Sequence, residues 1–261
     1  MTFKDKVVAI TGAAGGIGQS LCRYFLDEGA KIAAIDKNAN VEGLAADLKA
    51  TAGAFSHAVA DISEPTEVAR AFTSLTGALG PIDILVNNAG GSGHRTFALT
   101  DPTGWRREID GNLNGAYYCA HAAIPGMLAK RAGVIVGIGS VNGLSALGDP
   151  GYSAGKAAMI SLTRSLAQEY GRFGIRANIV LPGTVRTPLW QQRAAKNPNV
   201  LETLRRWYPL GRIVEPIDVA RAVGFLASDA ASAITGVALP VDCGLTSGNI
   251  VMARELTLED L

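Results

Sequence analysis

The chain has 261 residues, of which 48% are hydrophobic and 18% are charged, and its formal net charge is +1 at pH 7. These values are typical of one compact globular domain, because no Pro/Gly/Ser-rich or charged run divides the chain into two halves. The near-neutral charge argues against a nucleic-acid partner, and the absence of 18 uninterrupted apolar residues argues against a membrane span.

Short apolar runs alternate with longer amphipathic segments along the chain. Apolar runs without period-two alternation are typical of parallel strands that are covered on both faces. We expect seven such strands, at residues 6–12, 31–36, 55–61, 82–90, 133–140, 175–183 and 236–242. The segments between them, for example 18–29, 65–79 and 154–171, are long enough for helices. This alternation predicts a single α/β domain, residues 1–261, with right-handed crossovers.

The first strand runs directly into the glycine-rich turn TGAAGGIG at residues 11–18. Glycine lets the backbone approach a pyrophosphate closely, and the following helix offers unpaired N–H groups at its N-terminus. The spacing differs from the general G-x-G-x-x-G fingerprint, and a tight strand-to-helix turn needs glycine in any case. Asp36, which ends the second strand eighteen residues after Gly18, adds a carboxylate suited to the 2′-OH of an adenosine ribose. Together they predict a dinucleotide site.

Asp36 also bears on the choice between NAD and NADP. Its charge would repel a 2′-phosphate, whereas the charge of Lys37 beside it would attract one. Asp36 is the stronger indicator of the cofactor, because a side chain at a strand end points toward the ribose, whereas Lys37 can point into solvent. The predicted cofactor is therefore NAD.

Polar and small residues follow the third and fourth strands, at the edge where ligands bind on open α/β sheets. Asp61 and Ile62 follow the third strand, and Asp61 is suited to accept a hydrogen bond from an adenine amine. Asn88, Ala89 and Gly90 follow the fourth strand and are expected to line the adenosine side of the cleft. The alternative for the latter three is a tight polar turn without a ligand.

The segment YSAGK at residues 152–156 follows the fifth strand, which ends at Ser140. In a helix, Tyr152 and Lys156 lie on the same face, one turn apart. A free tyrosine has a pKa near ~10. An adjacent ammonium and an oxidised nicotinamide both favour phenolate, which would lower that pKa toward the range useful in acid–base catalysis. Such a pair can also be a surface contact, but here it coincides with the glycine-rich turn and Asp36.

On these motifs the chain resembles the short-chain dehydrogenase/reductase family over nearly its whole length. The matching motifs are T-G-x-x-x-G-x-G at Thr11, Gly12, Gly16 and Gly18, N-N-A-G at 87–90, the Asn of DGNLNG at Asn112, the Ser, Tyr and Lys at Ser140, Tyr152 and Lys156, and P-G-x-V-x-T at Pro182, Gly183, Val185 and Thr187. The resemblance implies a doubly wound Rossmann-type sheet of seven parallel strands with helices on both faces, and usually a homotetramer.

The resemblance also implies the roles of the site residues. Tyr152 is the acid/base, Ser140 orients the carbonyl or hydroxyl of the substrate, Lys156 also holds the nicotinamide ribose, and Asn112 anchors a water that passes protons onward. The implied cofactor contacts are Gly12, Gly16, Ile17, Gly18, Asp36, Asp61, Ile62, Asn88, Ala89, Gly90, Tyr152, Lys156, Pro182, Gly183, Val185 and Thr187.

The three cysteines, Cys22, Cys119 and Cys243, show no C-x-x-C spacing and the three histidines no H-x-x-x-H spacing. Neither a disulfide framework nor a metal site is predicted, and a reduced, cytoplasmic setting is expected. Cys243 lies in VDCG, where the family commonly has V-D-G-G. We expect this departure to alter the local backbone or a subunit contact, and we do not expect a reactive thiol.

Two segments lie outside the strand–helix rhythm. Residues 184–214, after the sixth strand, are long and contain prolines and aromatic residues, so we expect a substrate lid; a helical hairpin of structural value only is the alternative. The apolar residues of the C-terminal segment 247–261 could dock on a neighbouring subunit, or the terminus could fray.

The residues expected to face the substrate are polar or amphipathic: His94, Arg95, Asn142, Trp190 and Arg193. Arginine suits a carboxylate or phosphate through paired donors. They favour a polar hydroxylated substrate, such as a sugar, a polyol or a hydroxy acid, although solvated loop residues explain the pattern equally well.

The predicted function is hydride transfer between a secondary alcohol or ketone and NAD. An NADPH-linked ketone or 3-oxoacyl reductase is the alternative enzyme, and Asp36 argues against its cofactor. A dinucleotide-binding regulator without catalysis is disfavoured, because Ser140, Tyr152 and Lys156 are all present.

Overall fold

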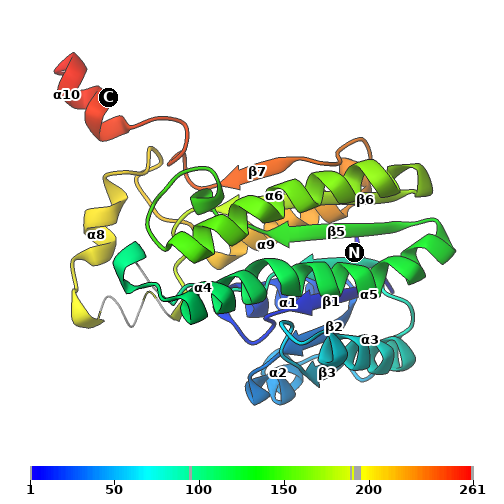
Figure 1. Cartoon of the computed structure of the whole chain (residues 1–261). Coiled ribbons are helices and arrows are strands. Elements are labelled where there is room, and N and C mark those ends of the chain that lie inside the picture. The colour runs from blue at the N-terminus through cyan, green and yellow to red at the C-terminus, as the bar shows by residue number, and fades with distance from the viewer. Residues whose placement is uncertain (1, 94–95, 189, 191–194, 260–261) are drawn as a thin grey trace.

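The structure is a computed structural model that describes residues 2–93, 96–188, 190 and 195–259. Its strands are β1 (Val7–Thr11), β2 (Lys31–Asp36), β3 (Phe55–Val59), β4 (Ile84–Asn87), β5 (Gly133–Ile138), β6 (Ile175–Pro182) and β7 (Ala238–Val241). They form one all-parallel sheet with the order β3-β2-β1-β4-β5-β6-β7 (Figure 1). Each strand lies within the range that its apolar run predicted, so the predicted fold class is confirmed.

Helices cover both faces of this sheet (Figure 1). The α-helices are α1 (Gly16–Asp27), α2 (Leu44–Asp47), α3 (Pro65–Leu79), α4 (Pro102–Ile109), α5 (Gly115–Lys130), α6 (Pro150–Tyr170), α8 (Val200–Arg205), α9 (Pro216–Ala227) and α10 (Ile250–Thr257). The short helical turns are η1 (Ala39–Glu42), η2 (Phe97–Leu99), η3 (Asp110–Asn114), η4 (Val141–Gly143), η5 (Gly171–Phe173) and η6 (Asp229–Ala231).

The core has two layers, one on each face of the sheet. Alternate residues of a strand point to opposite faces. Val8 therefore packs with Phe25 of α1 and with α9, whereas Val7 packs with Phe72 of α3 and Met127 of α5. Because both faces are buried, the strands carry the unbroken apolar runs seen in the sequence.

The order of the strands reverses at β1, which pairs with β2 on one side and with β4 on the other. Ligands on open α/β sheets bind at such a switch point, outside the carboxyl ends of the strands. There the Thr11 hydroxyl accepts hydrogen bonds from the backbone N–H groups of Asn88 and Ala89, both at 3.0 Å. In return, Asn88 Nδ2 donates to the carbonyl oxygens of Thr11 and Gly12, at 2.9 and 3.1 Å. These four bonds fix the loop after β1 against the loop after β4.

Helix α6 begins at Pro150, earlier than the pattern from residue 154 onward suggested. Proline has no N–H and a fixed φ, so it suits the first position of a helix. The preceding residue, Asp149, is in the left-handed region with a φ of 50°. As a result, Tyr152 lies in the first turn of α6 and Lys156 one turn further on.

The C-terminal helix α10 projects away from the rest of the chain (Figure 1). Met252 and Leu256 are 55% and 73% exposed, and α10 buries none of its residues. Docking of this helix on a neighbouring subunit therefore stays a prediction. In the described part of the chain, no helix combines the length and the apolar character needed to span a bilayer.

We predict that Thr11→Val lowers the free energy of unfolding by about 2 kcal/mol, because it leaves the part-buried N–H of Ala89 without an acceptor and leaves the N–H of Asn88 with only the carbonyl oxygen of Val86. Thr11→Ser keeps the hydroxyl and should cost only about 1 kcal/mol for the lost methyl group. Urea denaturation followed by fluorescence measures both. Equal losses in the two variants would contradict a role for the hydroxyl.

Candidate functional site

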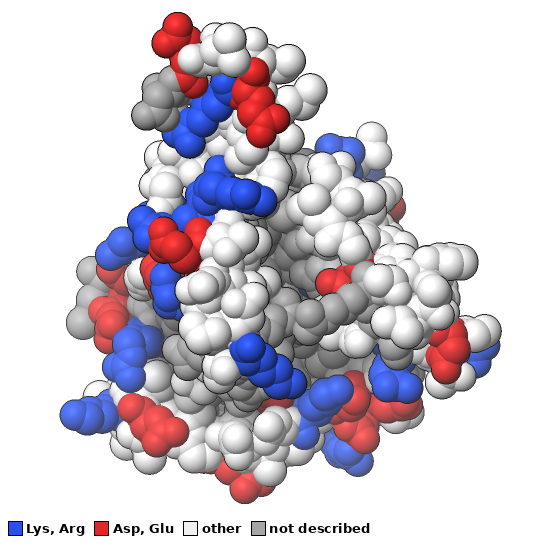
Figure 2. Space-filling model, turned by 90° about the vertical axis from the view of Figure 1, so that its left-hand side faces the viewer, with Lys and Arg blue, Asp and Glu red and all other residues white. Residues whose placement is uncertain are grey.

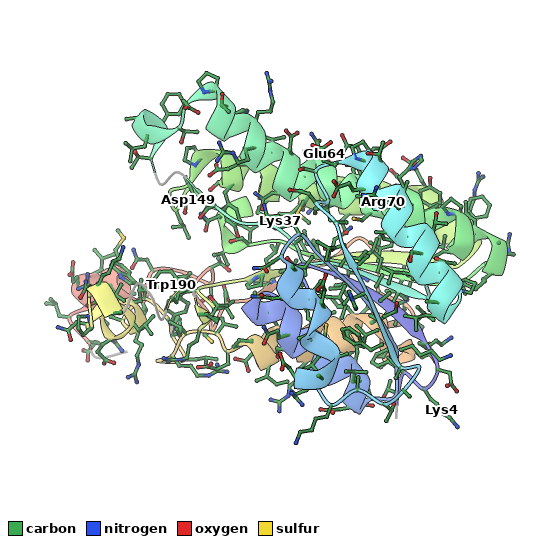
Figure 3. The ribbon with its side chains drawn as sticks, turned by 90° about the horizontal axis from the view of Figure 1, so that it is seen from below. Lys4, Lys37, Glu64, Arg70, Asp149 and Trp190 are labelled. Atoms are coloured by element: carbon green, nitrogen blue, oxygen red, sulfur yellow. The ribbon has the colours of Figure 1, made fainter. Side chains whose placement is uncertain are left out.

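A cavity of about 1040 Å³ opens at the carboxyl ends of the strands. Twelve of the predicted site residues line it: Ile17, Asn88, Gly90, Ser140, Asn142, Tyr152, Lys156, Pro182, Gly183, Val185, Thr187 and Trp190. Figure 3 shows Asp149 and Trp190, both from its wall, at one end of the molecule and Lys4 at the opposite end. The fold thus brings together residues that lie up to 173 positions apart, from Ile17 to Trp190.

The glycine-rich turn forms one side of this end of the sheet. Gly12 has a φ of +64°, and a Cβ atom there would lie 2.8 Å from Cα of Ala89. At Gly18 a Cβ atom would overlap the carbonyl oxygen of Gly12. The close packing of the turn therefore requires both glycines.

Helix α1 starts at this turn without a side-chain cap on Gly15 and without an acidic residue in its first turn. Its first N–H groups and the positive end of its dipole are therefore not neutralised by its own side chains. An anionic diphosphate fits such a helix end. The residues present are thus compatible with a dinucleotide cofactor.

The two acidic residues predicted for the adenosine end lie at the ends of β2 and β3. The Asp36 carboxylate accepts hydrogen bonds from the N–H groups of Ala14 and Asn38, each at 2.9 Å. Asp61 accepts hydrogen bonds from the N–H and the hydroxyl of Ser63 and lies 3.8 Å from Nζ of Lys37. Partial burial raises the pKa of Asp61, but the Ser63 hydrogen bonds and the Lys37 charge outweigh this and lower it overall. Asp36 thus fixes the glycine-rich turn, while Lys37 is turned toward Asp61.

Lys156 is buried beneath the cavity, with only 3% of its surface exposed. Its Nζ donates to the carbonyl oxygen of Ile138 at 2.8 Å and lies 3.6 Å from the sulfur of Met159. Burial lowers the pKa of Lys156 from 10.5 to about 8. The group is therefore still mostly an ammonium at neutral pH.

The structure differs from expectation in the pKa of Tyr152. Burial raises this pKa, and the negative charge of Asp149 raises it further, while a hydrogen bond with Ser140 lowers it. Nζ of Lys156 is 5.6 Å from the centre of the phenol ring and is held by Ile138, so it does not offset the burial. The protein's own groups therefore keep the phenol neutral at neutral pH.

Ser140 is held by the short turn η4 that follows β5. Its hydroxyl accepts a hydrogen bond from the N–H of Asn142 at 3.1 Å and lies 3.4 Å from Oδ1 of the same residue. Ser140 and Tyr152 both line the cavity and are close enough to share the hydrogen bond that lowers the phenol pKa. The structure thus brings the predicted serine and tyrosine together.

Asn112 lies behind the cavity, in the π-helical turn η3 between α4 and α5. Its Nδ2 donates to the carbonyl oxygens of Gly91 and Glu108, both at 2.8 Å, and its Oδ1 accepts the N–H of Gly91 at 3.1 Å. Single π-helical turns often occur at functional sites. The sequence motif identified Asn112, but it gave no sign of the widened turn, which depends on how α4 and α5 pack.

The predicted substrate residues are only partly described. Asn142 and Trp190 line the cavity, whereas His94, Arg95 and Arg193 lie outside the described residues. Further wall residues that sequence reasoning missed are Leu147, Asp149, Leu204, Trp207, Tyr208, Leu245 and Asn249. The adjacent aromatic residues Trp207 and Tyr208, in RWYPL, could have indicated a place in the cavity wall from the sequence. No sequence signal pointed to Leu245 and Asn249, because only the tertiary fold brings the C-terminal segment to this cavity.

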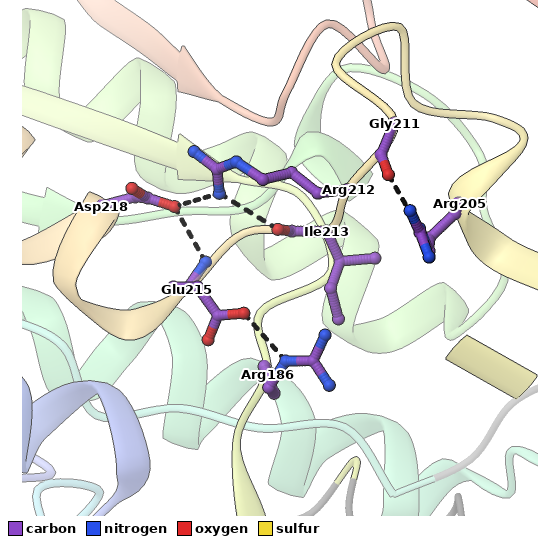
Figure 4. A network of polar contacts seen from close by, with 7 residues as sticks. All are labelled: Arg186, Arg205, Gly211, Arg212, Ile213, Glu215 and Asp218. Atoms are coloured by element: carbon purple, nitrogen blue, oxygen red, sulfur yellow. Dashed lines mark hydrogen bonds and ion pairs between the residues drawn. The ribbon is translucent and has the colours of Figure 1, made fainter. Parts of the chain in front are cut away.

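Three arginines of the segment 184–214 form hydrogen bonds or ion pairs with other groups of the chain (Figure 4). They are Arg186, Arg205 and Arg212. Arg186 Nε lies 2.8 Å from Glu215 Oε1, and Arg212 Nη1 lies 2.6 Å from Asp218 Oδ2. Arg186 therefore anchors this segment to Glu215, at the start of α9. Figure 2 shows basic and acidic side chains interspersed over this side of the molecule, with no basic stripe among the residues described there.

Cys243 has a φ of 53°, in the left-handed region that favours glycine, and Gly244 follows with a φ of 89°. The conformation typical of a glycine is therefore kept, and the side chain is accommodated at the cost of some backbone strain. Partial burial raises the pKa of the thiol, although the charge of Arg212 lowers it. A protonated thiol agrees with the expectation of low reactivity. Within the described ranges, no group of three or more His, Cys, Asp or Glu side chains could hold a metal ion.

Comparison with known proteins agrees with this geometry. A family model described as enoyl-(acyl carrier protein) reductase matches residues 12–246. The crystal structure of an oxidoreductase of the short-chain dehydrogenase/reductase family from Burkholderia thailandensis has a TM-score of 0.92 and 47% sequence identity, and the match covers 98% of each chain.

Two further relatives match over almost their full length. An uncharacterised oxidoreductase of Schizosaccharomyces pombe is 41% identical over 263 residues, which cover 100% of this chain and 98% of the relative. The 2-(S)-hydroxypropyl-CoM dehydrogenase 3 of Xanthobacter autotrophicus is 39% identical over 252 residues, which cover 94% of this chain and 98% of the relative. Solved relatives include one with NADP bound and one complexed with NADH.

We predict that Lys156 titrates near pH 8 in the cofactor-free protein, about two units below an ordinary lysine at ~10.4. The pKa is lower in the folded chain, so the unfolded chain binds more protons between these values. The free energy of unfolding should therefore rise as the pH increases from about 8 toward ~10, and Lys156→Met should lack this rise. NMR of ¹³C-labelled lysine, assigned with Lys156→Arg, measures the pKa. Titration near ~10 would contradict it.

Proposed function

The chain belongs to the short-chain dehydrogenase/reductase family, and we propose that it is an NAD-dependent enzyme that transfers a hydride between a secondary alcohol or ketone and the nicotinamide. The observation that carries the proposal is the meeting of Ser140, Tyr152 and Lys156 in one cavity at the switch point of the sheet. A phenol, a hydroxyl and an ammonium in one site supply the proton transfer and the positioning that alcohol oxidation requires.

The roles of the chain's own groups follow from their contacts. The Ser140 hydroxyl is positioned to bind the substrate oxygen beside the phenol. In the reducing direction, the neutral Tyr152 donates its proton to the oxygen of the forming alcohol; in the oxidising direction, its phenolate accepts that proton. When bound, NAD would supply the hydride acceptor. The positive charge of Lys156 favours the phenolate but does not offset the burial of the phenol by itself, so the positive charge of an oxidised nicotinamide would be needed beside it to make the proton available near neutral pH.

Cofactor binding is proposed for the groups around the switch point. The N-terminus of α1 would hold the diphosphate and Asp36 the adenosine ribose, while Lys156 would hold the nicotinamide ribose. The three N–H donors of the Lys156 ammonium exceed the two contacts made to Ile138 and Met159, which leaves one for a ribose hydroxyl. The pairing of Lys37 with Asp61 supports NAD over NADP, because Lys37 is the neighbour that would otherwise attract a 2′-phosphate.

For the substrate we propose a polar hydroxylated compound, such as a sugar, a polyol or a hydroxy acid. The cavity wall combines the aromatic side chains Trp190 and Trp207 with hydroxyl and amide groups, among them Ser92, Thr246 and Asn249. Flat apolar faces next to hydrogen-bonding groups suit a compact molecule with several hydroxyls. We also propose that residues 184–214 close over this substrate and that the chain assembles as a homotetramer.

The proposal predicts NAD-linked turnover in a screen of sugars, polyols, hydroxy acids and steroids. Tyr152→Phe should keep cofactor binding and lose at least ~100-fold in turnover, the usual scale for a positioned acid–base group. Tyr170→Phe, at the far end of the same helix, is the matched control and should keep its activity. Turnover confined to apolar steroids would rule out the polar substrate, and near-normal activity of Tyr152→Phe would rule out the mechanism.

We also predict that the purified protein binds NAD at least ~10-fold more tightly than NADP, a difference of ~1.4 kcal/mol. Asp36→Ala should reduce this ratio by removing the charge that repels a 2′-phosphate. Asp47→Asn, an exposed carboxylate in α2, serves as the control. Calorimetric titration of the wild type and both variants with NAD and with NADP gives six dissociation constants. Tight NADP binding with negligible NAD binding in the wild type would overturn the Asp36 argument.

A further inference from the structure

Glu108, to which the sequence assigned no role, is a buried acid beside the catalytic tyrosine. It lies near the end of α4 and only 5% of its surface is exposed. A carboxylate at that depth needs strong hydrogen-bond partners, because burial of a charge without them is costly. Two of its partners belong to opposite walls of the functional site.

The first partner is the catalytic helix α6. Its N-cap residue, Asp149, is in the left-handed region and makes no capping hydrogen bond with its side chain. Pro150 has no N–H, so the first turn depends on another acceptor. Glu108 Oε2 accepts the backbone N–H of Tyr152 at 3.0 Å. A residue from α4 thus caps α6 at the residue that bears the phenol, and its negative charge lies at the positive end of the helix dipole.

The second partner is the loop after β4. Glu108 Oε1 accepts the backbone N–H of Gly93 at 2.6 Å. Asn112, four residues after Glu108, clamps Gly91 of the same loop through its side-chain amide. Gly90 and Gly91 line the cavity together with Tyr152. One carboxylate therefore fixes the distance between the loop and the catalytic helix.

Gly151 shows how closely the two elements meet. A Cβ atom at this position would run into Oε2 of Glu108 and would lie 3.2 Å from its Cβ. Its φ is not positive, so the backbone does not demand glycine there. The space is needed for the carboxylate itself to reach the N–H of Tyr152.

We propose that Glu108 is a positioning residue for the reaction: it holds Tyr152 and the loop at residues 90–93 in the register in which phenol and substrate meet. The inference rests on the proposed function, since it concerns the same phenol. A displacement of about 1 Å at a reacting group can cost ~100-fold in rate, so a loose first turn of α6 lowers turnover without weakening the distant adenosine site.

Glu108→Gln tests this inference, because the amide has the same shape but replaces one acceptor oxygen with a donor that faces an N–H group. We expect kcat to fall about 10-fold with an unchanged dissociation constant for NAD. Hydrogen exchange should become faster in residues 149–156 and 90–93 and stay unchanged in the rest of the described chain. Asp83→Asn is the matched control: its carboxylate accepts the N–H of Val7 at 2.9 Å, at the opposite end of β1, so its kcat should stay at the wild-type value.

A double-mutant cycle separates this inference from the proposed function. In the Tyr152→Phe background, Glu108→Gln should change the residual turnover less than ~2-fold, because the group that it positions is already absent. A further loss of about 10-fold, or a wild-type kcat in the single variant, would overturn the positioning role. Retained activity in Tyr152→Phe alone would instead overturn the proposed function.

Gly151→Ala provides a second variant in case Glu108→Gln does not fold. It leaves the carboxylate in place but drives a methyl group into the space through which it contacts α6. We expect the same pattern of lower kcat, unchanged NAD binding and faster exchange in residues 149–156. Wild-type kcat in Gly151→Ala would overturn the inference independently.

Discussion

The hydroxyl of Thr11 is the contact on which the geometry of the whole site depends. It lies where the order of the strands reverses, and there the loops after β1 and β4 diverge to opposite sides of the sheet. Two backbone N–H groups end on this one buried oxygen, and Asn88 returns two hydrogen bonds. The glycine-rich turn and the N-N-A-G turn therefore act as one rigid unit. A cofactor bound across them meets a surface that is already organised.

Burial governs the chemistry on the other side of the cavity. It lowers the pKa of Lys156 and raises that of Tyr152, so it favours the neutral form of both groups. The pKa of Lys156 moves closer to neutral pH, whereas the pKa of Tyr152 moves further above it. Charge that arrives with a bound cofactor acts on both groups in this poorly solvated space, where it has a larger effect than in water. Burial by the protein alone thus keeps the phenol of Tyr152 protonated at neutral pH.

Much of the fold, and the meeting of Ser140, Tyr152 and Lys156 in one candidate site, could be predicted from the sequence, because their signals are local. Buried strands require unbroken apolar runs, and a turn like that at Gly12 requires glycine wherever it occurs. Glu108 and Asn249 could not be found in this way. Their neighbours lie far along the chain, and an acid in an amphipathic helix such as α4 looks like a solvated residue until the packing of α6 is known. The raised pKa of Tyr152 escaped prediction for the same reason, since it reflects enclosure and not spacing.

The two halves of the cavity differ in how they are built. The half at the switch point consists of strand ends and turns that share the two-layered core. The other half comes from described residues between Thr184 and Tyr208, such as Trp190, Leu204 and Trp207, and from the stretch around Leu245 and Asn249. These stretches follow β6 and β7 and do not belong to the sheet. Val185 and Val214 of this second half belong to the core, whereas its exposed and half-buried residues can change without disturbing the core. In descendants of such a chain, the second half can therefore change to accept new alcohols, while the residues proposed for hydride transfer stay the same. The separate construction of the two halves of the cavity wall is thus a source of evolvability.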